Sequence, residues 1–560
     1  MKAFWSRDKK RILYKILILA IIFFSLIKFL KFDFPITILE AKEGYTAFSL
    51  VKTFKDTNGD FPGLFFRTED QLIPSASVYL RIIPVLIFGL NFFSVRIITV
   101  LLSLLLLTVI YLTAHYFFKD RLKAIFSVLL FTISPFFIYE SIFKLDVILG
   151  VILVLTAFNF YLKQKIKYLI LCLVPAFFAG FIPFLMVLFF NVIFFVGKKS
   201  WLNLGKLAMA FLIIGVLIFI LNPSLSRDLI SITVLKQASP ENYGYLIDRR
   251  IAHGFTEKSP LITERFNFNR IAFNKVIYSF NELSKQIIGI FDFERLASPN
   301  QSYDVIKSVW TQGDNMIKFR FWEIPLIVIS LIYFLTRKKQ KYIVYATSLF
   351  LSLVIFGKSA LFYALPLIIL AEASLIFDLP DILKRSYLVK GIYTIGSILL
   401  ILSTISFFDI YFFHQDYWVK ENDLRQFQIW SELKEKDIGQ NKLFLTDRLG
   451  EPIFYYLFYE KVAPENFFNN RQEGGISSNG VKRISAVGNV YFSSFKYYES
   501  DRKPKQIWIG MAGEFAGDSL NYQGVTEVTD GKVYKKITDV KQNNQFIGSE
   551  IWFVKTKFDE

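Results

Sequence analysis

Long apolar runs, separated by short polar links, dominate the first 415 residues of the chain. Such runs begin near residue 13 and recur to about residue 413, and because a helix needs about 20 apolar residues to cross a bilayer, they predict roughly eleven spans. The expected spans are 13–30, 95–118, 124–139, 147–162, a short pair between 168 and 196, 207–221, 322–335, 342–356, 361–377 and 391–413. Pro175, Gly180 and Pro183 break the short pair. One long tilted helix there is the alternative, and it would invert the orientation of everything that follows.

The basic residues between the spans indicate their orientation. Lys and Arg gather in short links, which is typical of cytoplasmic loops. These links are 119–123, 163–167, 197–206, 337–341 and 383–390. With the N-terminus and these links in the cytoplasm, the long connections 32–94 and 222–320 and the tail after residue 413 lie outside. We therefore expect a multi-pass protein of a cytoplasmic (plasma) membrane.

Two other segments depart from the spanning pattern. Residues 79–93 are apolar but are interrupted by Arg81, Pro84 and Gly89, which predicts a helix lying on the outer membrane interface. From about residue 416 the pattern changes to period-two strands, such as "NKLFLTD", "SAVGNVYFSS", "KQIWIGM" and "KVYKKI", separated by turn residues. We therefore expect a transmembrane module over 1–415 and an extracytoplasmic mixed α/β domain over 416–560.

Composition agrees with an integral membrane protein and excludes several classes of function. Hydrophobic residues make up 53% of the 560 positions, and 63 are Phe. The net charge of +18 lies largely in the short links, so no nucleic-acid partner is expected. A single cysteine, Cys172, gives no disulfide framework. The three scattered histidines and the lack of a glycine-rich phosphate loop argue against a zinc site and against a cytosolic nucleotide donor.

Carboxylates at the outer membrane surface are the first candidates for chemistry, because a charge beside hydrocarbon is costly unless it is paired or hydrated. Glu40 and Glu43 follow the first span, and their spacing places them on one face of a helix. Asp146, with Glu140 and Lys144, lies in a short outer link that could equally be a solvated hairpin. Together these groups could enclose a water-filled pocket in which one carboxylate acts as a general base.

Cations on the same side are candidates for binding an anionic leaving group. Most of them are expected to be interface anchors whose charges reach toward lipid headgroups. The eight are Arg67, Arg81, Arg96, Arg249, Arg250, His253, Arg320 and Lys358. Lys358 and the Arg249–Arg250 pair are the preferred choices for a phosphate. No cofactor is certain, although paired carboxylates and a phosphate could hold Mg²⁺.

Several stretches resemble one family when they are taken in order. "EAKEGYTAFSLVKTFKDTNGDFPGLFF" and "VYLRIIPVLIFGLNFFSVRI" resemble the first outer loop of bacterial membrane glycosyltransferases with the GT-C fold. That group is glycosyltransferase family 39-like and is related to protein O-mannosyltransferases and lipid A aminoarabinose transferases. "ISPFFIYESIFKLD", "RFWEIPLIVISLIYFL" and "TDRLGEPIFYYLFY" resemble later pieces of the same group. The likeness covers nearly the whole chain, although each motif alone is weak.

The resemblance implies a function and roles for the site residues. Such enzymes transfer a sugar, here expected to be mannose-like, with inversion from a polyprenyl-phosphate carrier to a protein, lipid or glycan acceptor outside the membrane. The carboxylate after the first span would be the base, which is Glu40 or Glu43, and Asp146 would be the second acidic residue. Basic groups, with Arg81 among them, would hold the lipid phosphate.

The chain departs from the family pattern at three places. Leu39 stands where the first acidic residue is expected, Leu72 and Ile73 stand where a Lys is expected, and Ile142 replaces an Arg. Lys144 or Arg81 could supply the missing charge. Two other functions therefore stay open: a catalytically silent scaffold or lipid-carrier binder, and a polysaccharide polymerase or transporter. Transporters usually carry repeats and mid-membrane charges, whereas the charges here lie at one surface.

Overall fold

The computed structural model describes eighteen stretches of the chain, from Arg7 to Thr556, with gaps between them. These are residues 7–26, 34–60, 63, 65–68, 72–198, 323–337, 341–356, 362–383, 386–413, 421–434, 441–449, 451–476, 482–493, 505–511, 514–515, 527–528, 531–537 and 551–556.

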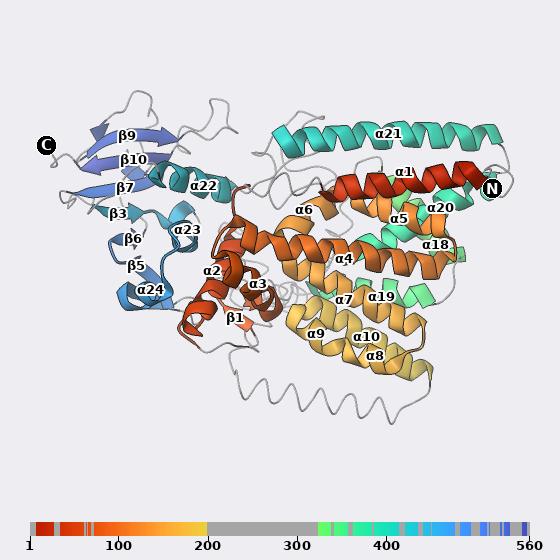
Figure 1. Ribbon diagram of the computed structural model, residues 1–560, viewed down its shortest axis with the longest axis horizontal. Helices are drawn as coiled ribbons and strands as arrows, with labels where there is room; N and C mark the ends of the chain where they lie inside the picture. The colour runs from red at the N-terminus through yellow and green to blue at the C-terminus, as the bar shows by residue number, and fades with distance from the viewer. Residues whose placement is uncertain are drawn as a thin grey trace, which may run out of the picture.

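A bundle of helices forms one end of the molecule, and a β-sheet with its covering helices forms the other (Figure 1). The N-terminal helix begins at the end of the bundle that is remote from the sheet (Figure 1). The bundle consists of α1 (Arg7–Leu26), α4 (Phe92–Phe118), α5 (Arg121–Thr132), α6 (Pro135–Phe143), α7 (Leu145–Leu162), α8 (Ile166–Leu171), α9 (Leu173–Ala179), α10 (Phe181–Gly197), α18 (Glu323–Arg337), α19 (Lys341–Phe356), α20 (Leu365–Leu383) and α21 (Ser386–Phe413).

Apolar side chains hold the bundle together around α7. Its buried face packs against α4 and α10, and the rings of Phe158, Phe190 and Tyr345 meet between α7, α10 and α19. In the described part of the chain, three helices are long and apolar enough to cross a membrane: Phe92–Phe118, Leu145–Leu162 and Phe362–Leu383. The expected total of about eleven spans stays a prediction, and the span expected over 207–221 lies outside the described residues.

The helix boundaries follow from proline and glycine. The single span expected over 124–139 is wrong, because α5 ends at Thr132 and α6 begins at Pro135. Proline has no N–H to donate to the preceding turn and pushes the residue before it out of the helical region. The break expected at Gly180 is confirmed, because its φ of 139° is a conformation that glycine tolerates and it separates α9 from α10. The breaks expected at Pro175 and Pro183 are wrong, since these prolines lie inside the first turns of α9 and α10.

The connection between α1 and α4 folds into two helices and a hairpin. Helix α2 (Ile38–Thr53) leads to the strands β1 (Phe65–Arg67) and β2 (Leu72–Pro74), and α3 (Ser75–Phe88) follows. Gly89 ends α3 at a φ of 70°, and Asn91 caps α4. One side of α3 exposes Ile83, Leu86, Ile87 and Phe88. The interfacial location expected for 79–93 stays a prediction, since no membrane is present.

The C-terminal part is a mixed sheet with helices, as the strand pattern predicts. The strand order is β4-β5-β6-β3-β7-β10-β9-β8. Strand β3 runs parallel to β6 and β7, and the other pairs are antiparallel. The strands are β3 (Lys442–Leu445), β4 (Arg471–Ile476), β5 (Lys482–Val487), β6 (Val490–Phe492), β7 (Gln506–Met511), β8 (Glu527–Val528), β9 (Gly531–Ile537) and β10 (Ile551–Thr556). All four quoted strand motifs contain a strand.

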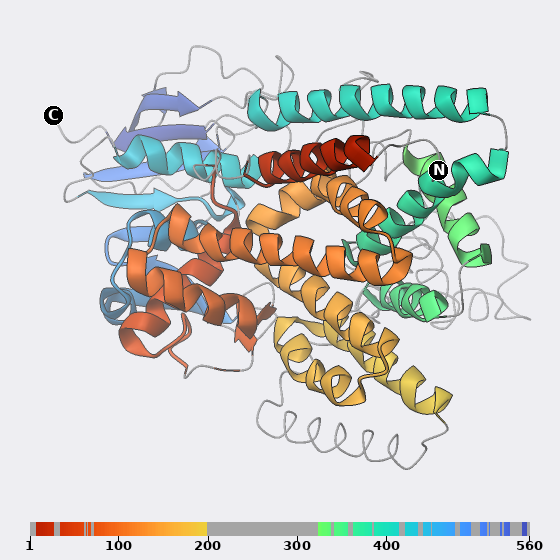
Figure 2. The ribbon, with the colours of Figure 1, turned by 45° about the vertical axis from the view of Figure 1, so that its right-hand side comes forward.

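Helix α2 lies between the bundle and the C-terminal part in both views (Figures 1 and 2). The C-terminal helices are α22 (Glu421–Lys434), α23 (Pro452–Tyr459) and α24 (Pro464–Asn470). Ala41 and Tyr45 of α2 share one apolar core with residues of α23, α24 and the sheet. The domain boundary at residue 415 and the side of the membrane on which each part lies stay predictions.

Candidate functional site

Helix α2 carries an unusual set of buried charges. Glu40, Lys42 and Glu43 are all buried in its first two turns. A charge removed from water is costly unless it is paired and hydrogen-bonded. Each of the three meets a partner of opposite charge on a different segment: Arg96 on α4, Glu451 before α23 and Arg81 on α3. The helix is therefore fixed in place by charge pairs on three sides.

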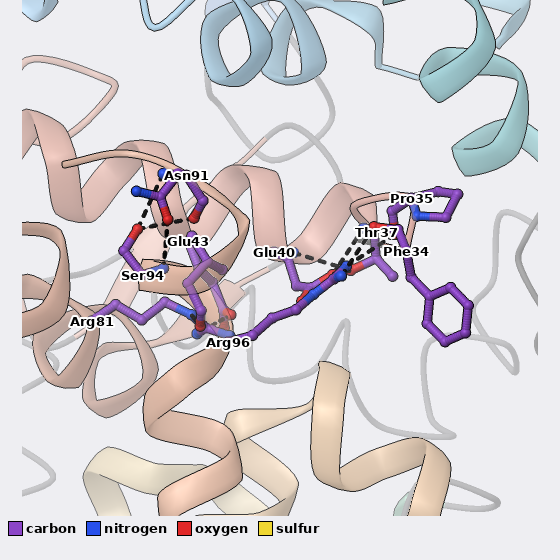
Figure 3. A network of polar contacts seen from close by, with 10 residues as sticks. Phe34, Pro35, Thr37, Glu40, Glu43, Arg81, Asn91, Ser94 and Arg96 are labelled. Atoms are coloured by element: carbon purple, nitrogen blue, oxygen red, sulfur yellow. Dashed lines mark hydrogen bonds and ion pairs between the residues drawn. The ribbon is translucent and has the colours of Figure 1, made fainter. Parts of the chain in front are cut away.

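Glu40 is fully engaged in holding the start of α2 (Figure 3). Its Oε1 accepts from Nε of Arg96 at 2.8 Å, and its Oε2 accepts from Nη2 at 3.0 Å. Oε2 also accepts from the backbone N–H of Thr37 at 3.0 Å, while the Thr37 hydroxyl oxygen accepts from the Glu40 N–H, which completes a capping box. Arg96 donates further bonds to the carbonyl oxygens of Phe34 and Pro35. Both oxygens of Glu40 are thus occupied.

Glu43 lies one turn further along α2 and forms a buried ion pair with Arg81 (Figure 3). Arg81 also donates to the carbonyl oxygens of Val95 and Ser77 at 3.0 and 3.2 Å, which fixes its guanidinium. Burial raises the pKa of Glu43 to about 7, against the lowering effect of Arg81, and the nearby charge of Asp146 raises it further. A carboxylate with this pKa can take up and release a proton near neutral pH.

Asp146 belongs to the same electrostatic group. It is the second residue of α7, and its charge interacts with Arg81, Lys144 and Glu43. Its side chain is partly exposed, yet Oδ1 is buried without a hydrogen-bond partner among the described residues. Nη2 of Arg81 is likewise buried without such a partner. A buried polar atom left unsatisfied costs about 1–3 kcal/mol, and such atoms gather at functional sites.

Two positions at which the resemblance expects charged residues are apolar in this chain. Leu39 and Ile73, which stand at the positions where the resemblance expects an acid and a Lys, pack in one apolar cluster with Leu50 and Val78. Leu39 and Glu43 are four residues apart on α2 and therefore lie on the same side of the helix, one turn apart. The polar group formed by Glu43 and Arg81 thus lies one turn from an apolar one.

The remaining expected site residues lie outside the part of the chain that the structure describes. They are Arg249, Arg250 and Lys358, together with His253 and Arg320. Lys144 forms an ion pair with Glu140 at 3.0 Å, at the end of α6. Within the described stretches, no three His, Cys, Asp or Glu side chains come together in a group that could hold a metal ion.

Sequence reasoning missed two of the interactions that shape this site. The Thr37-x-x-Glu40 spelling is a capping-box signal, and it could have revealed the structural role of Glu40. The pairing of Lys42 with Glu451 joins residues that are 409 positions apart, and no local pattern predicts it.

Comparisons with known proteins give distant likenesses. No protein-family model matches the chain, and no curated protein matches it. Among solved structures, the chain is similar to the archaeal oligosaccharyltransferase AglB from Archaeoglobus fulgidus in complex with an inhibitory peptide and a dolichol-phosphate. The identity is 15% and the TM-score 0.42, over 82% of this chain and 64% of that one. It is also similar to ArnT from Cupriavidus metallidurans bound to undecaprenyl phosphate, with 13% identity and a TM-score of 0.39, over 80% and 84% of the two chains.

Both neighbours are GT-C fold glycosyltransferases, the group that the sequence resembles. The chain spans less than two thirds of the oligosaccharyltransferase's length. With identities of 15% or less and TM-scores below 0.5, these likenesses carry no argument about activity. The chemistry must therefore be argued from the residues of the site itself.

Proposed function

We propose that the chain is a glycosyltransferase of the plasma membrane that uses a polyprenyl-phosphate-linked sugar. It transfers a mannose-like hexose to a protein, lipid or glycan acceptor at the outer face, where the C-terminal domain also lies. The observation that carries the proposal is the group formed by Glu43 in the second turn of α2, Arg81 in the middle of α3 and Asp146 at the start of α7. The order of sequence motifs that resemble GT-C enzymes supports it.

Glu43 is the proposed general base. It takes the proton of the acceptor hydroxyl as that oxygen attacks the anomeric carbon of the sugar. The new bond between the anomeric carbon and the acceptor oxygen forms on the face opposite the carrier phosphate, so the configuration is inverted. The bond between the anomeric carbon and the phosphate oxygen breaks, and its electron pair leaves with the polyprenyl phosphate. A base is most effective when its pKa lies near the working pH, and the pKa of Glu43 is about 7.

The geometry favours Glu43 over Glu40 for this role. Both oxygens of Glu40 accept charge-assisted bonds from Arg96, so neither oxygen is available to an acceptor hydroxyl. Glu43 lies one turn away, on the side of α2 that also carries Leu39. In the proposal, the catalytic carboxylate that the family carries at the position of Leu39 is supplied here by Glu43, one helical turn further along α2.

Arg81 and Asp146 have complementary proposed roles. Arg81 holds Glu43 by one side of its guanidinium, and its unpartnered Nη2 donates to the donor phosphate as negative charge develops there. Asp146 orients the acceptor hydroxyl or a sugar hydroxyl through Oδ1. Arg249, Arg250 and Lys358 stay proposed as further phosphate ligands. A divalent cation bound by the carboxylates and the phosphate stays a proposal as well.

One observation favours a second candidate, the silent scaffold that binds the lipid carrier. Leu39 stands at the acidic position that the resemblance expects, and the next residue, Glu40, is paired with Arg96. If Glu43 does not act as a base, the group of charges could still bind a lipid phosphate through Arg81 without turnover.

A transfer assay in membranes separates the two candidates. The donor is polyprenyl-phosphate carrying a radiolabelled hexose, and loss of label from the carrier is followed for the wild type and for Glu43→Gln, Asp146→Asn and Glu40→Gln. We expect the first two variants to lose transfer while still binding donor, and Glu40→Gln to retain it. Donor binding without turnover in the wild type, with every hexose tried, would establish the scaffold.

A further inference from the structure

The C-terminal part touches α2 along most of its length. At the start of the helix, Asp423 of α22 accepts the backbone N–H of Ile38 at 3.2 Å. Two turns further on, the Tyr45 hydroxyl donates to the carbonyl oxygen of Val462, just after α23, at 3.0 Å. Apolar contacts with α23 and α24 fill the space between these bonds. The C-terminal part is therefore in a position to set where α2 lies.

Lys42 forms the central contact of this interface. Its Nζ lies 2.7 Å from Oε1 of Glu451, and the two side chains are only 2% and 18% exposed. The ammonium also lies 5.4 Å from the centre of the Phe454 ring. Glu451 directly precedes α23, so the bond connects α2 to the first turn of that helix. A lysine buried to this degree would be costly without its partner.

Lys42 and Glu43 are neighbours that face different parts of the molecule. Successive residues of an α-helix are about 100° apart around its axis. Lys42 accordingly reaches the C-terminal part, while Glu43 reaches Arg81 on α3. A rotation or shift of α2 that lengthened one of these bonds would also move the other charge.

We propose that the Lys42–Glu451 ion pair positions Glu43 for transfer, so that the C-terminal part completes the active site through α2. Lys42 and Glu451 are positioning residues in this scheme and touch neither donor nor acceptor. The inference rests on the proposed function of Glu43. It gives the C-terminal part a role in the chemical step itself, besides any role in acceptor choice.

The proposal predicts an effect on turnover and not on donor binding. A displacement of about 1 Å in a reacting group can cost about 100-fold in rate, so Lys42→Met should lower kcat by about 10- to 100-fold. The KM for the donor should change less than about twofold, because the proposed phosphate ligand Arg81 lies on α3 and is also held by the carbonyl oxygens of Val95 and Ser77. Exchanging the charges, with Lys42→Glu and Glu451→Lys together, should restore much of the loss.

The experiment measures kcat and KM of the full chain in detergent micelles, with polyprenyl-phosphate-mannose as donor. Hydrogen–deuterium exchange of peptides from α2 is measured on the same samples. The control is Lys123→Met, which removes another lysine–carboxylate pair, with Asp378 (3.1 Å; 22% and 18% exposed), beyond the far end of α4. Lys123→Met should leave kcat and α2 exchange unchanged, while Lys42→Met should speed α2 exchange.

Each outcome decides the matter. Lowered kcat with faster α2 exchange, both reversed by the charge exchange, supports the proposal. Unchanged kcat in Lys42→Met overturns it, as does a lower kcat that the charge exchange does not restore. If the wild type itself transfers no sugar, the proposed function fails, and the positioning of α2 by Lys42 then stands or falls by the exchange data alone.

Discussion

The proposed role of Glu43 as general base predicts how transfer should depend on pH. Burial raises the pKa of this carboxyl from its ordinary value of 4.5 to about 7, although Arg81 opposes the shift. A general base works only when it is deprotonated, so kcat should fall as the pH falls through 7. At pH 6 about a tenth of the enzyme should be active, and at pH 5 about a hundredth. A base with the ordinary carboxyl pKa would keep nearly full activity at pH 6.

Changing Arg81 tests the cause of the shift as well as its size. Arg81 lowers the pKa of Glu43, so Arg81→Met should move the acid limb of the kcat profile to higher pH. Arg81→Lys keeps the charge and should leave the limb close to its wild-type position. The donor is a phosphodiester whose ionisation does not change in this range, so the limb reports the protein.

The assay measures kcat at saturating donor between pH 5 and 9, with protein whose integrity is checked at each pH by size-exclusion chromatography. Two results would refute the reasoning. One is a wild-type rate that is flat from pH 8 down to pH 5. The other is an acid limb that stays at the same pH, or moves to lower pH, in Arg81→Met.

Two further predictions concern stability. Arg96→Met leaves the carboxylate of Glu40 buried without its cation and should lower the free energy of unfolding by about 3–5 kcal/mol. Arg96→Lys keeps the charge and should lose less, and denaturant unfolding in detergent measures both variants. A loss in Arg96→Met no larger than in Arg96→Lys would contradict this role of Arg96. Gly150→Ala places a methyl group against the hydroxyl of Tyr363 and should lower the free energy of unfolding by about 1–3 kcal/mol. The methyl group of Gly396→Ala has no atom within 4 Å, so this variant should be neutral or slightly stabilising. Equal melting temperatures for the two alanine variants would argue against this packing of α7 on Tyr363.

Hydrophobic periodicity and the positions of glycine and proline predict much of this fold, because they depend only on neighbouring residues of the chain. The apolar run that ends at Phe118 becomes α4, and period-two segments become β3, β7 and β9. The break at Gly180 follows from glycine's freedom at positive φ. The span expected over 124–139 failed because Pro135 divides it, and a proline inside an apolar run can either kink a helix or start a new one.

The candidate site was predictable in position but not in its pairings. Glu40, Glu43 and Asp146 stand out in the sequence because they are acids beside apolar runs. Their partners come from tertiary packing: Arg96 reaches Glu40 across 56 positions, and Lys42 reaches Glu451 across 409. Most cations on that side are expected to be interface anchors and Arg81 to be a phosphate ligand, yet Arg81 and Arg96 are both fully buried. A spacing rule describes one face of a helix and contains no information about which distant segment will cover it.

The central claim is that Glu43 is the base of a sugar transfer from a polyprenyl-phosphate donor. The most direct measurement compares the release of labelled hexose from that donor by the wild type, Glu43→Gln and Glu40→Gln, each shown to be folded and to bind donor. The account predicts transfer by the wild type and by Glu40→Gln, and none above background by Glu43→Gln. Transfer at the wild-type rate by Glu43→Gln would contradict it.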